Sequence, residues 1–216
     1  DQISLMTLAG ELKGAKEVIK KLKGLGIRIA LGHTNADAEI CSDCFKQGVT
    51  MLTHTFNAMP GIHHRAPGPI GAALQNGAIA FGLIADGIHV EPSIAILLQR
   101  LAGKKLVLVS DALAPYGLQD GLYHFDQRKL IVKKGTCWLE NGTLAGVNIP
   151  LLEGCKRLAQ WSQNPSAAIW AATMAPRKVL NERISLESQL IGQSLLDLLR
   201  WKWKRNGECL NWHHAV

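Results

Sequence analysis

Four short apolar segments of this sequence each run into a histidine or an aspartate. The segments are Ile27–Leu31, Val49–Leu52, Ala80–Ala85 and Leu106–Val109, and the residues that follow them include His33, His54, His89 and Asp111. Near-continuous apolar strands that alternate with helical patterns predict a parallel sheet covered on both faces. A (β/α) barrel builds its active site at the carboxyl ends of such strands. Three imidazoles and a carboxylate at these points therefore indicate metal-assisted hydrolysis.

The stretches between the strands have the periodicity of amphipathic helices. One face of residues 11–23 collects apolar side chains, and Gly24 and Gly26 then end that helix. Further helices are expected over Ala36–Lys46, Gly71–Asn76 and Pro92–Leu101, with residues 57–69 as a loop. Ile3–Leu8 is a candidate for one more strand.

The pattern changes after Asp111. Short antiparallel strands are expected over Tyr123–Phe125, Lys129–Val132 and Thr136–Leu139, with Asn141-Gly142 as a turn, and helical periodicity returns over Ile149–Trp161 and Ser166–Met174. Residues 195–216 predict two strands joined at 205–208, with tryptophans interleaved among basic residues. That interleaving can mark a nucleic-acid surface, but alternation on a half-buried strand gives the same pattern, and we favour the strand.

The composition describes a globular chain with a sizeable core. Its 216 residues, 47% hydrophobic and 19% charged, suffice for one large domain or for one domain with a small appendage. The net charge of +7 is scattered over helical stretches, which favours a solvated basic face over a nucleic-acid site. We therefore expect no nucleic acid as a partner. Because no apolar run approaches the ~18 residues of a membrane span and no signal peptide is visible, we expect no membrane as a partner either.

Five cysteines are spread through the chain, an odd number that argues against a disulfide framework and predicts a reducing, cytoplasmic location. Cys41-Ser-Asp-Cys44 is a CxxC, but it lies inside a helical pattern and no second CxxC follows at zinc-ribbon spacing. We therefore favour ordinary, partly buried thiols over redox or metal chemistry at this pair.

His33 and His54 are the best candidates for metal ligands. Each closes a predicted strand, and their separation of 21 positions suits one β/α crossover, so the two imidazoles can share one ion. Asp111 closes the fourth strand, where a carboxylate can take a proton from the attacking water and later return it to the leaving group. The competing interpretation of Asp111 is a helix-capping or turn residue.

Other polar residues lie close to these strand ends. Asn57 and Arg65 could hold an anionic or polyhydroxy substrate, since the guanidinium fork of arginine suits phosphate. His89 could ligate a metal, bind substrate or polarise a carbonyl, whereas Asp86 suits a loop or supporting role better than ligation. We leave the adjacent pair His63-His64 out, because neighbouring side chains point in different directions in most backbones.

At this point the sequence resembles a known family. Five segments, in order, look like motifs of the N-acetylglucosamine-6-phosphate deacetylases of the amidohydrolase superfamily: Gly32-His33-Thr34-Asn35-Ala36, Thr53-His54-Thr55-Phe56-Asn57-Ala58-Met59, Ile84-Ala85-Asp86-Gly87-Ile88-His89, Ser110-Asp111-Ala112 and Asn141-Gly142-Thr143-Leu144-Ala145-Gly146. The match runs from about residue 3 to about residue 180. The tail, residues 195–201, resembles the segment that closes the small β domain of the family.

The resemblance implies a role for each matched residue. His33 and His54 would be metal ligands, Asp111 the general base and acid, and His89 a substrate contact that helps to polarise the acetamide carbonyl. The remaining matched positions would bind or line the pocket of the sugar phosphate, namely Asn57, Ala58, Arg65, Asp86, Gly87, Ile88, Leu144, Ala145 and Gly146. In family members the arginine can reach into the neighbouring site of a dimer, which implies a homodimer for the complete protein.

The resemblance also implies that part of the barrel and of the active site is missing from this sequence. The first half of the family carries the early barrel strands, a substrate-binding histidine and a glutamate that is the third protein ligand of the metal. Glu11 is no substitute, because it lies in the helix-opening segment after the first predicted strand. Since a catalytic zinc usually has three protein ligands, His33 and His54 alone make an incomplete site for a divalent ion, for which zinc is the default.

We therefore expect an α/β fold, the C-terminal half of a (β/α)8 TIM-type amidohydrolase barrel over residues 1–180, with C-terminal strands of a small β domain over residues 181–216. The expected activity is metal-dependent deacetylation of N-acetylglucosamine 6-phosphate to glucosamine 6-phosphate and acetate. Two alternatives stay open: an amidohydrolase that acts on another amide or cyclic amide, and a catalytically incomplete fragment.

Overall fold

The computed structural model describes residues 3–182, 185, 191–204 and 209–214. Its centre is a five-stranded parallel sheet whose strands follow one another in chain order, β1-β2-β3-β4-β5. The strands are β1 (Leu5–Leu8), β2 (Arg28–Leu31), β3 (Met51–Leu52), β4 (Ala80–Leu83) and β5 (Leu106–Leu108). The expected α/β class with a parallel sheet is confirmed, and the candidate first strand is present as β1.

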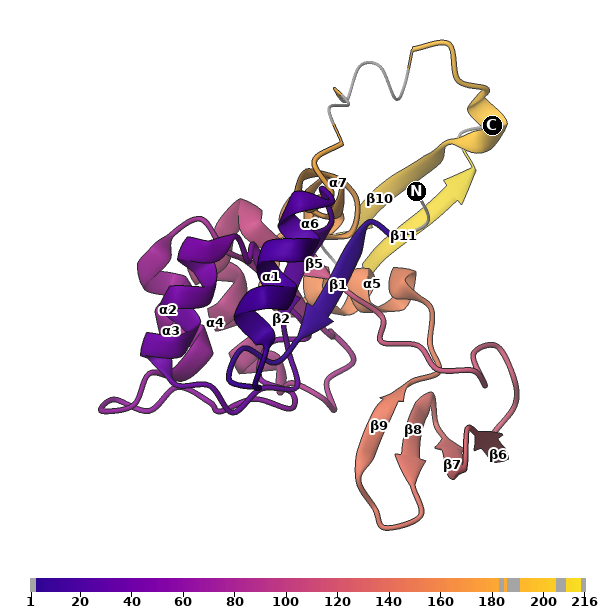
Figure 1. The fold of residues 1–216 in the computed structure, drawn as a ribbon. Coiled ribbons are helices and arrows are strands. Elements are labelled where there is room, and N and C mark those ends of the chain that lie inside the picture. The colour runs from indigo at the N-terminus through magenta and orange to yellow at the C-terminus, as the bar shows by residue number, and fades with distance from the viewer. Residues whose placement is uncertain (1–2, 183–184, 186–190, 205–208, 215–216) are drawn as a thin grey trace.

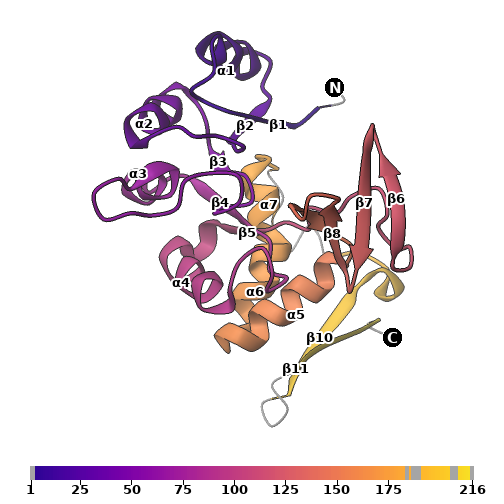
Figure 2. The ribbon, with the colours of Figure 1, turned by 90° about the horizontal axis from the view of Figure 1, so that it is seen from below.

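Four helices connect these strands and cover one face of the sheet (Figures 1 and 2). They are α1 (Ala15–Gly24), α2 (Ala38–Gln47), α3 (Gly68–Asn76) and α4 (Pro92–Ala102), and a short 3-10 turn, η1 (Gly103–Lys105), leads into β5. Two starts are capped as their sequences suggest: the Asp37 side chain accepts the Ile40 N–H at 2.9 Å, and Glu91 accepts the Ser93 N–H at 2.7 Å before a helix that opens on proline.

Helix α1 begins four residues later than the periodicity predicts. Gly14, just before it, has φ 85°, a left-handed conformation that interrupts a helix, and the carboxylate of Glu11 is occupied by hydrogen bonds to another loop. The apolar periodicity over residues 11–23 therefore overestimates the length of this helix.

The two faces of the sheet carry side chains of different size. The face toward α1–α4 holds large, fully buried side chains, among them Ile29, Leu31, Leu52, Phe81, Leu83 and Leu106. The opposite face presents Ala30, Met51, Ala80 and Val107, which pack with Ala175. Small side chains allow α6 (Pro165–Ala172) and α7 (Met174–Val179) to lie close against this second face. Burial of both faces explains why the strands are near-continuously apolar.

The helix expected over Ser166–Met174 is broken into α6 and α7 at Thr173, where φ is −123° and ψ −68°. Pro176 follows closely and lacks the N–H that a continuous helix would need. The preceding helix, α5 (Leu151–Ser162), packs against α6 and against the C-terminal strands.

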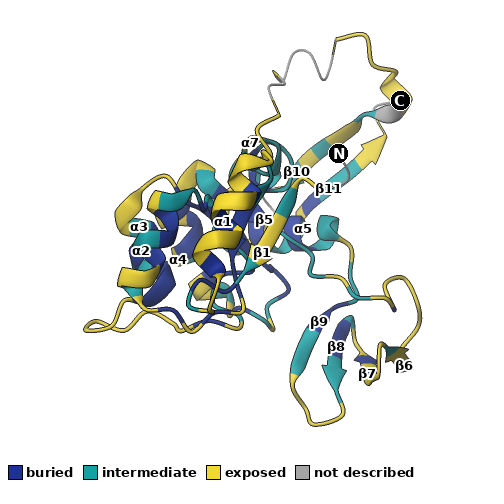
Figure 3. Cartoon of the chain, viewed as in Figure 1, coloured by how far each residue is buried: buried dark blue, intermediate teal, exposed yellow. Residues whose placement is uncertain are grey.

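A separate four-stranded antiparallel sheet follows β5 and projects from the body (Figure 1). Its strands are β6 (Gly121–Phe125), β7 (Arg128–Lys133), β8 (Thr136–Leu139) and β9 (Leu144–Val147). The first three were expected; β9 was not. Its sequence, Leu-Ala-Gly-Val, has only Ala and Gly between its two larger apolar residues and shows no strand alternation. Figure 3 shows more exposed surface on this sheet than on the parallel one.

The C-terminal hairpin joins β10 (Leu199–Lys204) to β11 (Cys209–His214), with Trp201 paired opposite Trp212. Residues 195–197, expected to extend the first strand, form a 3-10 turn, η2 (Leu195–Asp197), and the expected joint at 205–208 lies outside the described residues. Leu210 is buried in the main core, and Trp201 and Trp203 pack against it. The hairpin therefore shares the core of the parallel sheet.

Within the described ranges, no helix is both long enough and apolar enough to span a bilayer.

Candidate hydrolytic site

His33 and His54 meet beyond the ends of neighbouring strands β2 and β3. Their Nε2 atoms lie 3.0 Å apart, and the two rings are nearly perpendicular, with centroids 4.8 Å apart. Both residues have positive φ, 48° for His33 and 25° for His54, a conformation that non-glycine residues adopt only rarely. The chain thus turns sharply after each strand, and each turn directs an imidazole toward the other.

Small residues let the strands approach closely around this pair. A side chain at Gly32 would place its Cβ 2.8 Å from Cβ of Thr53 and 3.0 Å from Thr7, and these two threonines share a hydrogen bond of 2.8 Å. A Cβ at Gly82 would lie 2.9 Å from the backbone nitrogen of His54. Both glycines are therefore required by packing next to the histidines.

The loop after His33 is held by the Glu11 carboxylate. It accepts hydrogen bonds from the Thr34 hydroxyl and from the backbone N–H of Asn35, the latter at 2.7 Å. Burial raises the pKa of Glu11, but these hydrogen bonds outweigh it, and the pKa lies below its usual value. Both carboxylate oxygens of Glu11 are thus engaged with the loop after His33.

The turn after His54 fixes the imidazole. Nδ1 of His54 lies 3.2 Å from the carbonyl oxygen of Asn57, to which only a protonated Nδ1 can donate. In that tautomer of the neutral ring, Nε2 keeps its lone pair and faces His33. Burial lowers the pKa of His54, although the negative charge of Asp111 opposes the effect. The neutral ring that a metal requires is therefore favoured.

The imidazole pair fits two positions of a tetrahedral metal site. Two nitrogens bound to one ion at about 2.0–2.1 Å would lie about 3.3 Å apart, close to the observed 3.0 Å between the Nε2 atoms. The described residues contain no cluster of three or more histidine, cysteine, aspartate or glutamate side chains that could hold a metal. His33 and His54 thus supply part of a coordination shell.

Asp111 follows β5 with the same unusual backbone, φ 53°. Its influence on the pKa of His54 places its charge within electrostatic reach of the imidazole pair. Its carbonyl oxygen accepts the Val147 N–H at 3.1 Å, and a Cβ at Gly146 would lie only 2.7 Å from that oxygen. The end of strand β9, at Gly146 and Val147, therefore lies beside the backbone of Asp111.

Only some of the residues expected to bind a phosphorylated sugar lie next to the histidine pair. The Asn57 side chain donates to the carbonyl oxygens of His54 and Thr55, so it stabilises the turn, and Ala58 accepts the Thr34 N–H at 3.0 Å. Arg65 is exposed and its Nη1 lies 2.6 Å from Nε2 of His64. Among the described residues, no hydrogen bond or ion pair joins Arg65 to His33, His54 or Asp111.

Asp86 and His89 form a buried pair after β4. Oδ2 of Asp86 lies 2.6 Å from Nδ1 of His89, and Oδ1 accepts the backbone N–H groups of Ile88 and His89 at 2.9 and 2.8 Å. Burial raises the pKa of Asp86, but the hydrogen bonds from His89 and from the backbone outweigh it, and the pKa is lowered. Gly87, with φ 77°, allows the tight turn between them.

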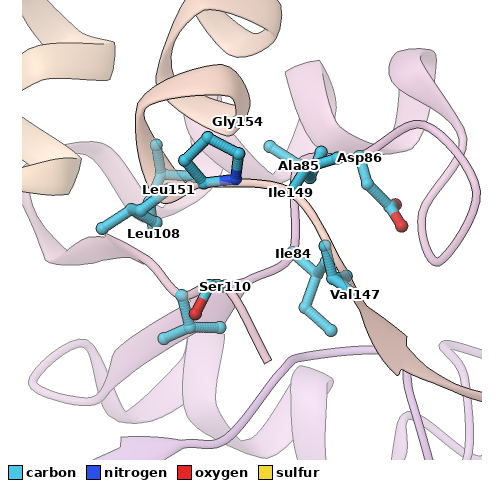
Figure 4. A pocket seen from close by; sticks show the side chains of 11 residues that line it. Ile84, Ala85, Asp86, Leu108, Ser110, Val147, Ile149, Leu151 and Gly154 are labelled. Carbon is cyan, nitrogen blue, oxygen red and sulfur yellow. The ribbon is translucent and has the colours of Figure 1, made fainter. Parts of the chain in front are cut away.

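A small cavity lies between the ends of β4 and β5 and the start of α5 (Figure 4). Ile84, Leu108, Ser110, Val147 and Leu151 are among its mainly apolar lining residues. Its volume of about 10 Å³ holds about one water molecule, so it is far too small for a sugar phosphate.

No family model matches the sequence. Curated relatives do: N-acetylglucosamine-6-phosphate deacetylase of Bacillus subtilis is 40% identical over 161 residues (74% of this chain, 41% of the relative), and that of Vibrio furnissii is 33% identical over 194 residues (89% and 49%). N-acetylgalactosamine-6-phosphate deacetylase of Escherichia coli O157:H7 is 32% identical over 179 residues (82% and 48%).

Solved structures agree. A variant N-acetyl-D-glucosamine-6-phosphate deacetylase of Mycobacterium smegmatis, in complex with N-acetyl-D-glucosamine-6-phosphate, matches with a TM-score of 0.79 at 29% identity, over 82% of this chain and 49% of its own. The Thermotoga maritima enzyme matches with a TM-score of 0.78 at 27% identity, over 83% and 50%. This chain is a relative of the N-acetylglucosamine-6-phosphate deacetylases. It spans about half the length of the deacetylases that it matches, as a C-terminal portion would.

Sequence reasoning missed supporting residues of this deacetylase-like site. Glu11 holds the loop after His33, and Arg157 of α5 donates to the backbone carbonyl of Asp86 at 2.6 Å. Neither has a local signal, because each acts on a loop far away in the sequence. Thr7 and Thr53, which are 46 positions apart, are a third example.

Proposed function

We propose that this chain forms the C-terminal part of a metal-dependent deacetylase that converts N-acetylglucosamine 6-phosphate to glucosamine 6-phosphate and acetate. The convergence of the His33 and His54 Nε2 atoms, with Asp111 on a strand end of the same sheet, carries this proposal. The names of the relatives supply the substrate class.

The fold supports the same proposal. Five parallel strands in sequential order, with a helix after each of the first four, are what a part of a (β/α)8 barrel would contain. We assign residues 1–180 to this partial barrel and residues 181–216 to the last strands of a small β domain, which here pack on the barrel portion through Leu210.

His33 and His54 would hold a divalent ion, for which we propose zinc, with a further protein ligand, a glutamate, from outside this chain. Such an ion would act as a Lewis acid toward the water and the acetamide carbonyl. Asp111 would accept a proton from water as its oxygen attacks the carbonyl carbon. As the C–N bond breaks, Asp111 would return that proton to the departing amine.

The residues after β3 and β4 would bind the sugar. His89 would present Nε2 to the substrate, and the turn of Asn57 and Ala58 would offer backbone groups. Gly87 and Ile88 of the following loop, and Leu144, Ala145 and Gly146 of β9, would line the pocket. Because Arg65 is exposed on a loop and pairs with His64, we propose that it binds phosphate in the neighbouring site of a homodimer.

All five cysteines are free thiols, which suits a reducing compartment, and we propose the cytoplasm. Two alternatives have to be compared with this proposal. One is deacetylation of the galactosamine epimer, for which the E. coli O157:H7 relative is named. The other is a catalytically incomplete fragment.

The test is an acetate-release assay with zinc on the complete protein and on this chain alone, alongside elemental analysis. The substrates are N-acetylglucosamine 6-phosphate, its galactosamine epimer and unphosphorylated N-acetylglucosamine. Turnover of the first substrate above the other two supports the proposal. In the complete enzyme, Asp111→Asn should lower turnover by about 10²–10⁴ while zinc content stays unchanged. Near-normal turnover of this variant would exclude Asp111 as the base. Zinc binding without any turnover by the wild-type chain would favour the incomplete fragment.

A further inference from the structure

The carboxylate of Asp86 has no free edge for a substrate. Its Oδ1 accepts two backbone N–H groups and its Oδ2 contacts Nδ1 of His89 at 2.6 Å. The side chain is only 3% exposed, and that of His89 only 5%. In Figure 4 the carboxylate points away from the pocket lined by Ile84 and Ser110. Asp86 is thus engaged by its own loop.

The same loop is fixed from outside by helix α5. Nη1 of Arg157 donates to the Asp86 carbonyl oxygen at 2.6 Å, and Nε of Arg157 is 3.3 Å from Oε1 of Glu153, one turn earlier. A Cβ at Gly87 would lie 3.3 Å from the Trp161 ring, so the loop backbone rests against α5 at a second point. Two residues of one helix therefore set the height of the loop above the sheet.

The contact with Asp86 also selects the form of the His89 ring. A carboxylate only accepts hydrogen bonds, so Nδ1 must carry a proton. Within the described part of the chain, Nε2 of His89 makes no hydrogen bond. In the neutral ring it is an acceptor at the end of a fixed carboxylate–imidazole pair, the arrangement by which a buried aspartate orients a catalytic histidine in serine proteases.

We infer that Asp86 and Arg157 are positioning residues for His89: Asp86 fixes the Nδ1–H tautomer of the imidazole, and Arg157 holds the loop that carries both. Neither touches the substrate. The catalytic consequence of this assignment rests on the proposed function, whereas the state of the His89 ring does not.

The test measures the ring directly. Long-range ¹H–¹⁵N spectra of this chain, labelled with ¹⁵N-histidine, separate protonated from unprotonated ring nitrogens, and His89→Asn identifies the signals of His89 among eight histidines. We expect Nδ1–H with an unprotonated Nε2 at neutral pH. Asp86→Asn presents an amide N–H to Nδ1 and should invert the pattern to Nε2–H. A wild-type ring in the Nε2–H form overturns the inference, even if the variant fails to fold.

Substitutions in α5 test the role of Arg157. Arg157→Met should broaden or split the His89 signals, and Arg157→Lys should restore them in part. Glu153→Gln, which neutralises the carboxylate beside Nε of Arg157 and Nζ of Lys156 but keeps Nη1 of Arg157 on the Asp86 carbonyl oxygen, is the matched control and should leave them unchanged. His89 signals that are the same in Arg157→Met and wild type would remove Arg157 from the assignment.

Kinetics then separate this inference from the proposed function. In the active enzyme, Asp86→Asn should lower kcat about 100-fold or more through the wrong tautomer, with zinc content unchanged. An inverted tautomer with unchanged kcat would retain Asp86 as the residue that orients the ring but remove His89 from the reaction. Absence of turnover in the wild type would contradict only the proposed function.

Discussion

His54 and His89 end neighbouring strands of one sheet, yet they are supported in different ways. His54 has a left-handed backbone conformation, and its Nδ1 donates to the carbonyl oxygen of Asn57. Its unprotonated Nε2 faces the imidazole of His33. His89 lies in a loop whose carboxylate holds its ring. An imidazole whose Nδ1 donates to a neutral carbonyl oxygen, with its Nε2 opposite a second imidazole, suits a cation. An imidazole paired with a carboxylate in its own loop suits an oriented hydrogen bond to a polar ligand. We therefore propose that the surroundings of each ring, and not its place at a strand end, separate the two roles.

The largest expected effect separates the two histidines by metal affinity. His54→Asn should weaken zinc binding by this chain by more than about 100-fold, because loss of a ligand should exceed the 10–100-fold cost of losing a supporting partner. His89→Asn should leave affinity unchanged. Competition with a chromophoric chelator measures both. Equal losses in the two variants would mean that the histidines act alike and the comparison fails.

The next effect concerns the backbone on which His54 depends. Gly82→Ala forces a Cβ within 2.9 Å of the His54 nitrogen and 3.0 Å of the Leu52 carbonyl oxygen, neither of which can move without disturbing the sheet. We expect a loss of about 2 kcal/mol in the free energy of unfolding and weaker zinc binding.

Gly24→Ala is the matched control for that substitution. Gly24 ends α1, has ordinary φ and has open space around its Cβ position, so alanine there should be neutral or stabilise by about 0.5 kcal/mol. Urea denaturation gives both values. A Gly82 variant as stable as the Gly24 variant would show that the turn at His54 can shift.

A smaller, pH-dependent effect is expected at Glu11, which supports the loop after His33. Since its pKa is lowered in the folded state, its stabilising contribution is complete above about pH 4.3, the unfolded value, and is lost as the pH falls through the folded pKa. Glu11→Gln should cost about 1 kcal/mol at pH 7, and the difference from wild type should shrink toward pH 3.

Asp43→Asn, which breaks an exposed contact with Lys46 on α2, is the reference and should change stability by less than about 0.5 kcal/mol at pH 7. Urea denaturation at pH 7 and pH 3 tests the pair. A Glu11 variant whose deficit stays constant with pH would mean that the carboxylate charge does not stabilise the loop.

The sequence allowed the strand ends to be located because buried parallel strands are continuously apolar and their first polar residues stand out. His33, His54 and Asp111 were found in this way. The supporting contacts were not, since Arg157 lies 71 positions from Asp86 and Glu11 lies 23 from Thr34, and no periodicity links such pairs. Asp86 resembles a site residue in sequence, but only the structure reveals that backbone N–H groups and His89 contact its carboxylate.

Strand β9 was missed for a related reason. Leu144–Val147 has only Ala and Gly between its two larger apolar residues, so it shows no alternation. Its position depends on Gly146, which allows the backbone to reach the Asp111 carbonyl oxygen. The positive φ values at the site were equally invisible, because histidine and aspartate are compatible with many backbone conformations.

Those positive φ values constrain which residues can replace the site side chains. At His33, His54 and Asp111 the left-handed backbone by itself disfavours valine, isoleucine and threonine, whatever their chemistry. A library randomised at these three positions would therefore be filtered first by folding and only then by reactivity. Asparagine and glycine, which tolerate a left-handed backbone, should dominate the folded members of such a library.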